Sequence, residues 1–194
     1  MMVKICGITN REDALAAVEC GAGALGFNFY PASPRYIRPE EAARIGAELP
    51  PGVWRVGVFV NETTREIARI SKAAGLDVAQ LHGDEPPSAA PAGARYWKAF
   101  RVDERFRPEL MDNYQAEAYL LDSSGGGSGQ TFDWERARGI GRRIVLAGGL
   151  DASNVRAAIE AVRPWGVDAC SRIESAPGRK DHAKMKEFLK AALA

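Results

Sequence analysis

The amino-acid sequence predicts an α/β protein whose eight parallel strands close into a single compact (β/α)8 barrel, the TIM barrel. Short β-type runs alternate with helical patterns along the whole chain, as expected when helical crossovers join parallel strands. There are eight such runs, and most are continuously apolar, as expected when both faces of a sheet are covered. An open doubly wound sheet is the alternative, and the count of eight favours the barrel.

The length of the chain sets a further condition on this fold. With 194 residues it is shorter than most (β/α)8 barrels, which usually have at least about 200. A barrel with short loops fits that length. No linker divides the sequence, so residues 1–194 are predicted to form one domain.

The first half of the chain gives the clearest elements. Strands are predicted at residues 3–6, 24–29, 54–60 and 78–81. Thr9 with Glu12 has the spacing of a capping box, and Thr63 with Glu66 repeats it, so each pair predicts a helix start. Pro39 is a favoured first helical residue, and acidic residues follow it.

The second half continues the alternation with weaker helices. Strands are predicted at residues 96–100, 118–121, 144–147 and 167–170. Prolines at 86, 87, 91 and 108 interrupt the helical patterns after the fourth and fifth strands. A helix is expected near residues 153–162. A last amphipathic helix is predicted from the spacing of Met185, Phe188, Leu189 and Ala192.

Composition bounds the class of function. The hydrophobic fraction is 46%, the charged fraction 26% and the net charge +1, which gives no electrostatic argument for nucleic acid or an anionic membrane as partner. No apolar run reaches the ~18 residues of a membrane span, and no signal peptide opens the chain. The three cysteines are far apart and indicate reduced thiols in a cytoplasmic protein.

The barrel rule converts the strand list into a candidate site, because active sites lie at the carboxyl ends of the strands. Cys6 ends the first strand near a helix start, which can favour the thiolate; the alternative is a small buried hydrophobe. Cys20 and Cys170 are interpreted as structural. Asp122 follows an apolar strand, where a carboxylate is costly unless it is functional or paired, for example as a cap or an arginine partner.

Two loops predict a phosphate site. Gly148 and Gly149 follow the seventh strand, and Ser171 and Arg172 follow the eighth, where barrels often bind phosphate. Glycines there let backbone N–H groups approach an anion; a tight turn is the alternative. The glycine-rich stretch at 123–129 is either a lid or a flexible connector, and it does not have the sequence of a P-loop.

Two further polar residues belong to the candidate site. Arg35 lies in a stretch stiffened by two prolines, and its guanidinium suits a bidentate grip on a carboxylate; an exposed solubilising arginine is the alternative. His82 follows the fourth strand and is either polar lining of the site, an acid or base, or structural.

Taken in order, these segments resemble the phosphoribosylanthranilate isomerases of tryptophan biosynthesis. The resemblance extends from the first strand to the last helix. The matching segments are KICGIT at 4–9, GF at 26–27, SPRY at 33–36, VAQLHG at 78–83, LD at 121–122 with the glycine stretch, FDW at 132–134, LAGGL at 146–150, ESAPG at 174–178 and KD at 180–181.

The resemblance implies an Amadori rearrangement of N-(5-phosphoribosyl)anthranilate to 1-(2-carboxyphenylamino)-1-deoxyribulose 5-phosphate. Cys6 aligns with the general base of the family, Asp122 with its general acid, and Arg35 with the residue that grips the anthranilate carboxylate. Such an isomerisation involves no redox change, so neither cofactor nor metal is expected. The substrate is a small phosphorylated molecule, and both monomer and homodimer are open.

One position departs from the family, which usually has Ser-Ser-Gly-Val-Glu after the eighth strand. Here Cys170 to Glu174 reads CSRIE, so Arg172 replaces a glycine. Arg172 either adds a contact to the phosphate or points away on a different backbone path, because a non-glycine residue tolerates positive φ poorly.

Three rival functions remain open from the sequence. The histidine-pathway isomerase uses two aspartates, and Cys6 speaks against it. A phosphate-ligand sensor without turnover is favoured only by Arg172. A thiol-redox protein built on Cys6 lacks a nearby resolving cysteine in the sequence.

Overall fold

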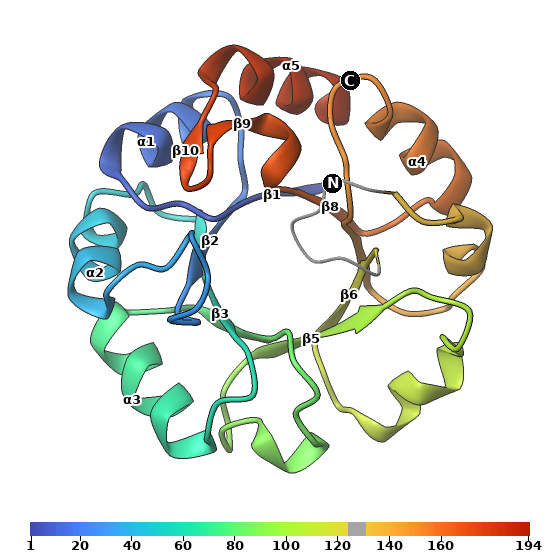
Figure 1. Cartoon of the computed structure of the whole chain (residues 1–194), viewed down its shortest axis with the longest axis horizontal. Coiled ribbons are helices and arrows are strands. Elements are labelled where there is room, and N and C mark those ends of the chain that lie inside the picture. The colour runs from blue at the N-terminus through green and yellow to red at the C-terminus, as the bar shows by residue number, and fades with distance from the viewer. Residues whose placement is uncertain (124–130) are drawn as a thin grey trace.

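The computed structural model describes residues 1–123 and 131–194, and its eight parallel strands close into a barrel (Figure 1). Each strand pairs with its neighbours in chain order, and the first pairs with the last from Met2–Gly166 to Ile5–Ala169. The strands are β1 (Met2–Cys6), β2 (Ala24–Asn28), β3 (Trp54–Phe59), β4 (Val78–Leu81), β5 (Tyr96–Arg101), β6 (Ala118–Asp122), β7 (Ile144–Leu146) and β8 (Gly166–Ala169). The predicted (β/α)8 barrel is confirmed.

Helices surround the barrel unevenly, as Figure 1 shows. The α-helices are α1 (Arg11–Glu19), α2 (Pro39–Ala47), α3 (Thr64–Ala74), α4 (Val155–Val162) and α5 (His182–Leu193). After β4, β5 and β6 the described connections hold only short 3₁₀ helices, η1 (Pro87–Ala89), η2 (Pro108–Asn113) and η3 (Trp134–Ala137). Proline begins two of them, and it removes backbone donors that a longer helix needs. Among the described residues, no helix is both long enough and apolar enough to cross a bilayer.

The start of α1 corrects one prediction. Asn10, not Thr9, caps this helix, because its side chain accepts the backbone N–H of Asp13 at 2.8 Å. The Thr9 hydroxyl instead donates to the carbonyl of Gly178, which ties the loop after β1 to a hairpin near the C-terminus. Thr63 caps α3 as predicted, accepting from the N–H of Glu66 at 3.2 Å.

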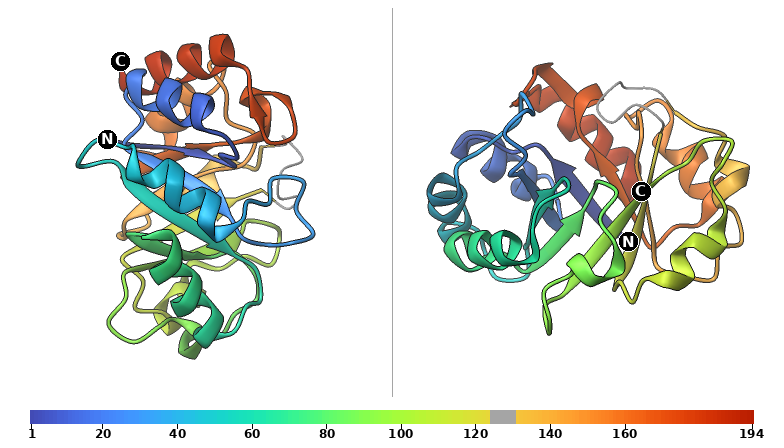
Figure 2. Two further views of the ribbon diagram at one scale, coloured as in Figure 1. Left: turned by 90° about the vertical axis from the view of Figure 1, so that its left-hand side faces the viewer. Right: turned by 60° about the horizontal axis from the view of Figure 1, so that its bottom comes forward.

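A short hairpin follows β8 and lies at the rim of the barrel, beside α1 and β1 (Figure 1). It consists of η4 (Ser171–Ile173), β9 (Glu174–Ala176) and β10 (Arg179–Lys180). The side view in Figure 2 places this hairpin at the end of the molecule opposite both termini. Because β1 begins beside the N-terminus, the hairpin lies at the end where the strands finish.

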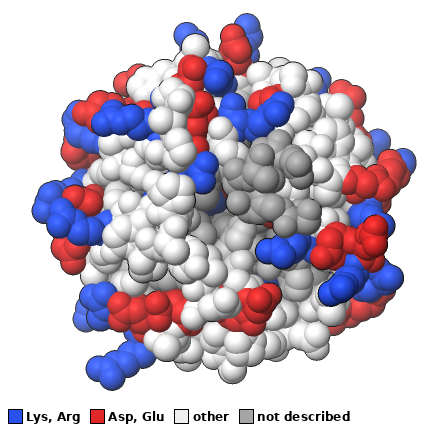
Figure 3. Space-filling view, viewed as in Figure 1, with Lys and Arg blue, Asp and Glu red and all other residues white. Residues whose placement is uncertain are grey.

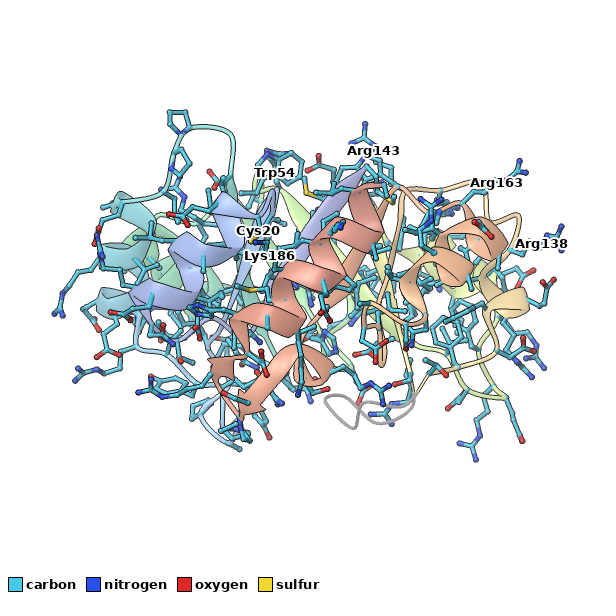
Figure 4. The ribbon with its side chains drawn as sticks, turned by 90° about the horizontal axis from the view of Figure 1, so that it is seen from above. Cys20, Trp54, Arg138, Arg143, Arg163 and Lys186 are labelled. Atoms are coloured by element: carbon cyan, nitrogen blue, oxygen red, sulfur yellow. The ribbon has the colours of Figure 1, made fainter. Side chains whose placement is uncertain are left out.

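The interior of the barrel has its own apolar core, separate from the core between strands and helices. Trp97 is fully buried in it and packs against both Trp54 and Trp165, with ring centroids 6.1 Å and 5.9 Å away, and these two rings also pack against each other. Figure 4 shows Trp54 and Arg143 along one edge of the molecule, where β3 and β7 begin. This tryptophan group forms the floor of the barrel, and polar side chains gather at the other end.

Candidate active site

Cys6 stands at the end of β1, half-buried, where it faces a glycine on the next strand. Cys6 pairs in register with Gly26 of β2. A Cβ atom at Gly26 would lie 2.7 Å from the Cys6 Sγ, so a larger residue there would displace the thiol. Cys6 therefore stands at the carboxyl end of β1, and its role in the site stays a prediction.

Lys4 lies beneath Cys6 on the same face of β1, since side chains two residues apart on a strand point the same way. Its side chain is fully buried, and its Nζ donates to Oδ1 of Asp168 on β8 at 3.0 Å. Burial would lower the pKa of Lys4, but the charges of Asp168 and Cys6 raise it. Burial raises the pKa of Asp168 to about 7, against the opposing effect of Lys4. Neither residue was identified from the sequence.

Cys170 lies beside Cys6, although it was predicted to be a structural residue within the last strand. β8 ends at Ala169, and Cys170 precedes η4 at the mouth. A hydrogen bond between the two thiols lowers the pKa of Cys6 well below its usual value, and the charge of Lys4 adds to this effect. The same bond raises the pKa of Cys170. Cys6 is thus the thiol of the pair that ionises first.

Asp122 ends β6 and is held at both carboxylate oxygens. Its Oδ1 accepts the backbone N–H of Ser123 at 2.8 Å, and its Oδ2 lies 3.3 Å from Nε2 of His82. The amide nitrogen of Gln80 lies 2.9 Å from the other ring nitrogen of His82. An amide nitrogen donates, so this contact leaves the ring proton on Nε2, facing Asp122.

Gly148 is needed for this arrangement. It has a φ of +83°, and a Cβ atom there would lie 2.7 Å from the Ser123 nitrogen and 3.0 Å from the Asp122 Oδ1. The glycine predicted to admit an anion therefore also admits the carboxylate of Asp122.

A cavity of about 450 Å³ opens beside Asp122, and its lining includes His82, Lys98, Phe100 and Arg101. The space-filling view in Figure 3 shows a hollow at the centre of this face, with most charged side chains around the rim of the molecule. Lys98 is buried and donates to Glu85 at 2.9 Å, so its charge is matched within the wall. The cavity is a suitable place for a small organic molecule.

Arg35 reaches the mouth from the loop after β2. Its stem lies over Gly7, where a Cβ atom would come within 2.8 Å of the Arg35 Cδ. Its Nε and Nη2 donate to the carboxylate of Glu174, the shortest distance being 2.7 Å. Lys180 donates to the same carboxylate at 2.8 Å. Arg35 is therefore a fixed part of the site, 14% exposed, and not a solvated surface residue.

The predicted phosphate loops come together at a small hollow of about 40 Å³ between β7 and β8. Gly148, Gly149, Ser171 and Arg172 line it, together with Asp122, Asp168 and Cys170. Within the described residues, no protein acceptor receives the backbone N–H of Gly148 or Gly149. These donors are therefore available to an anion at the mouth.

Arg172 has no positive φ, so its backbone carries no strain of the kind that favours glycine. Its guanidinium donates to Asp151 at 2.6 Å and 2.8 Å and is 47% exposed. The side chain thus lies at the rim of the hollow, with its charge partly matched. The glycine-rich stretch, interpreted as either a lid or a flexible connector, falls largely on residues 124–130, outside the described residues.

Comparison with known proteins identifies the family to which this chain is similar. Residues 3–191 match the family model described as N-(5'-phosphoribosyl)anthranilate (PRA) isomerase. The isomerase of Solibacter usitatus is 54% identical, covering 100% of this chain and 98% of the relative.

Solved structures agree with the family match. A phosphoribosyl anthranilate isomerase from Thermus thermophilus superposes with a TM-score of 0.94 at 42% identity, covering 100% of this chain and 98% of that one. Another, in complex with reduced 1-(o-carboxyphenylamino)-1-deoxyribulose 5-phosphate, gives 0.90 at 46% identity with the same coverage. With a family match over nearly the whole chain and relatives this similar, the chain belongs to the N-(5'-phosphoribosyl)anthranilate isomerases.

Proposed function

We propose that this isomerase of tryptophan biosynthesis rearranges N-(5'-phosphoribosyl)anthranilate with Cys6 as general base and Asp122 as general acid. The observation that carries this proposal is the pair itself. A thiol with a lowered pKa stands at one side of the barrel mouth, and a carboxyl group held over a cavity stands at another. Acid and base are thus delivered by different strands, β1 and β6, to one opening.

The reaction begins with protonation of the furanose ring oxygen by Asp122, which opens the ring to an iminium ion. Asp122 has to carry a proton at this point. His82 and the N–H of Ser123 keep the carboxyl group in position over the cavity.

Cys6 then takes the proton from C2 of the ribose, giving an enolamine that tautomerises to the ketone. The thiolate is the reactive form, and the hydrogen bond from Cys170 with the charge of Lys4 favours it. One proton leaves Asp122 and one arrives at Cys6, so the enzyme returns to its starting state once a proton passes back.

Recognition uses the two ends of the substrate. We assign the phosphate to the hollow lined by Gly148, Gly149 and Ser171, where backbone N–H groups are available. Arg172 adds positive charge from the rim. We assign the anthranilate carboxylate to Arg35, because Glu174 occupies Nε and Nη2 and leaves Nη1 for a second carboxylate. His82 lines the larger cavity beside Asp122.

The test is an assay of the purified protein on freshly made N-(5'-phosphoribosyl)anthranilate, following the loss of anthranilate fluorescence. Cys6→Ala and Asp122→Asn are each expected to lower kcat by about 10²–10⁴. Cys20→Ala is the matched control, because Cys20 follows α1 on the outside of the barrel (Figure 4). Saturable binding of the substrate without turnover by the wild type would instead support a sensor, and full activity of Cys6→Ala would overturn the assignment of the base.

A further inference from the structure

Lys4 is the one charged side chain of β1, and the chemistry above does not require it to touch the substrate. Its exposed fraction is 0%, and its only side-chain hydrogen bond to a carboxylate among the described residues is that to Asp168. A buried ammonium group is costly and is retained only where it is paired or has a use. The two residues are 164 positions apart, so the pair also joins the first strand to the last.

The position of Lys4 relative to Cys6 suggests that use. A Cβ atom built on Gly26 would lie 2.7 Å from the Cys6 Sγ and 3.1 Å from the Lys4 Cε. The thiol and the end of the lysine stem therefore meet over the same backbone position of β2. An ammonium group at this depth acts in a medium of low polarity, where its attraction for an anion is much stronger than in water.

We propose that Lys4 and Asp168 form a positioning pair that holds Cys6 as a thiolate from beneath, ready to accept the proton from C2. The proposal rests on the proposed function, in which Cys6 is the base. Asp168 has the complementary task of keeping Lys4 charged, since burial alone would favour the neutral amine. Their effects on Cys6 oppose each other: the ammonium favours the thiolate, and a charged Asp168 disfavours it.

The balance between them depends on the other titratable groups that face Cys6. Asp168 lies on β8, and Cys170 follows the end of that strand. Lys180 and Glu174 belong to the hairpin, and Arg35 to the loop after β2. Glu174 has a pKa held below its usual range, so it stays ionised and binds both Arg35 and Lys180. Asp168, whose pKa burial raises to about 7, neutralises Lys4 only in part near neutral pH. The positive charge of Lys4 is therefore not fully cancelled, and it can stabilise the Cys6 thiolate.

The experiment measures the ionisation of Cys6 itself, independently of turnover. The rate at which iodoacetamide alkylates the Cys6 peptide is followed by mass spectrometry between about pH 5 and pH 10, a range that brackets the ordinary thiol pKa. The variants are Lys4→Met and the double variant Lys4→Met/Asp168→Asn, which leaves no unpaired carboxyl group and so guards against failure to fold. The matched control is Lys98→Met/Glu85→Gln, because Lys98 and Glu85 form another buried pair, with an N–O distance of 2.9 Å.

Removal of the ammonium is expected to move the midpoint of alkylation upward by about one to two pH units in Lys4→Met. The shift is expected to be smaller in the double variant, because the charge of Asp168 is lost with that of Lys4, and the midpoint should stay unmoved in the control. The acid limb of kcat/KM is expected to move by the same amount as the midpoint in each variant. A folded Lys4→Met variant with the wild-type midpoint would overturn the proposal, even if Cys6→Ala is inactive. Should Lys4→Met fail to fold, a double variant whose midpoint lies at or below that of the wild type would overturn it. If the alkylation midpoint shifts but the pH profile of kcat/KM does not, the result would support the effect of Lys4 and Asp168 on the Cys6 thiol. It would contradict the proposed function, in which Cys6 is the general base.

Discussion

The two ends of the barrel interior differ in the side chains that fill them: one end is apolar, and the other is polar and titratable. At the floor, Trp54, Trp97 and Trp165 pack ring against ring, and their contacts are apolar. At the mouth, the inward positions carry charge or a thiol, as at Cys6 and Asp122. The floor gains stability from burial alone. The mouth holds groups whose burial is costly, and this cost is offset by hydrogen bonds between strands far apart in the sequence.

This difference teaches that activity and stability are separable along the barrel axis. The strands β1 and β6 carry apolar residues near their start and a titratable side chain at their end. β1 shows this within five residues, from the partly buried Met2 that packs against the inner core to Cys6 at the mouth. Substitutions at the mouth should therefore mainly lower kcat, and substitutions at the floor should mainly lower the free energy of unfolding.

The largest effect is expected at the mouth. Asp122→Asn preserves the shape of the side chain and an oxygen that can accept the N–H of Ser123, but its amide nitrogen faces the ring proton of His82 and has no acidic proton to give. We expect kcat to fall by about 10²–10⁴, while the free energy of unfolding falls by only about 1–2 kcal/mol. Urea unfolding and the fluorescence assay check the two parts. A variant that loses several kcal/mol of stability would show that Asp122 is mainly a structural residue.

The next effect is expected at the floor. Trp97→Ala removes the fully buried ring that packs against Trp54 and Trp165 and is expected to lower the free energy of unfolding by about 3–5 kcal/mol. Because the ring lies away from Cys6 and Asp122, kcat per folded molecule should stay within about twofold at a temperature where the variant is folded. A large fall in kcat under those conditions would mean that the floor and the mouth are coupled.

Glu174→Gln should affect both quantities, since Glu174 supports the site without performing the chemistry. We expect KM to rise about tenfold, because Arg35 loses a charged partner, and stability to fall by about 2 kcal/mol. Burial would raise the pKa of Glu174, but the hydrogen bonds from Arg35 and the charge of Lys180 outweigh it and lower the pKa.

The sign of the pH dependence follows from that lowered pKa. The stabilisation is fully present above the unfolded glutamate pKa of about 4.3 and is lost as pH falls through the lower folded value. The wild type should therefore lose stability in this acidic window, and Glu174→Gln should have a shallower slope there. Equal slopes in urea unfolding at several acidic pH values would contradict the role given to Glu174.

The smallest effect is expected at the rim. Arg172→Gly restores the residue usual in the family and breaks an exposed ion pair with Asp151, so stability should change by less than about 1 kcal/mol. We expect KM to rise about threefold, because the guanidinium already shares its charge with Asp151. An increase of about a hundredfold or more would show that Arg172 leaves Asp151 and grips the phosphate directly.

The strands were predictable because their signal is local. Each is a short apolar run, and the rule that barrel sites lie at the strand ends then located Cys6, His82, Asp122 and the two phosphate loops. The start of α1 was not predicted correctly, because Thr9 has the spacing of a cap but its hydroxyl is used by Gly178 of the distant hairpin. Local spacing gives no information on such a competing partner.

The supporting network was missed for the same reason. Lys4 with Asp168 and Arg35 with Glu174 are pairs separated by 164 and 139 positions. One local signal was present: a lysine inside an otherwise apolar strand is unusual enough to indicate a buried partner. The role of Cys170 depends on where β8 ends, and an error of one residue there moved it from the mouth into the strand.

The central claim, that Cys6 takes the proton from C2 of the ribose, is tested most directly by an isotope effect. Single-turnover rates of the wild type and of Cys6→Ala would be measured on substrate carrying protium or deuterium at C2. The account predicts that Cys6→Ala is at least about a hundredfold slower and shows a large primary isotope effect, because proton removal has become the slow step. A rate close to that of the wild type, or a slow rate without an isotope effect, would contradict it.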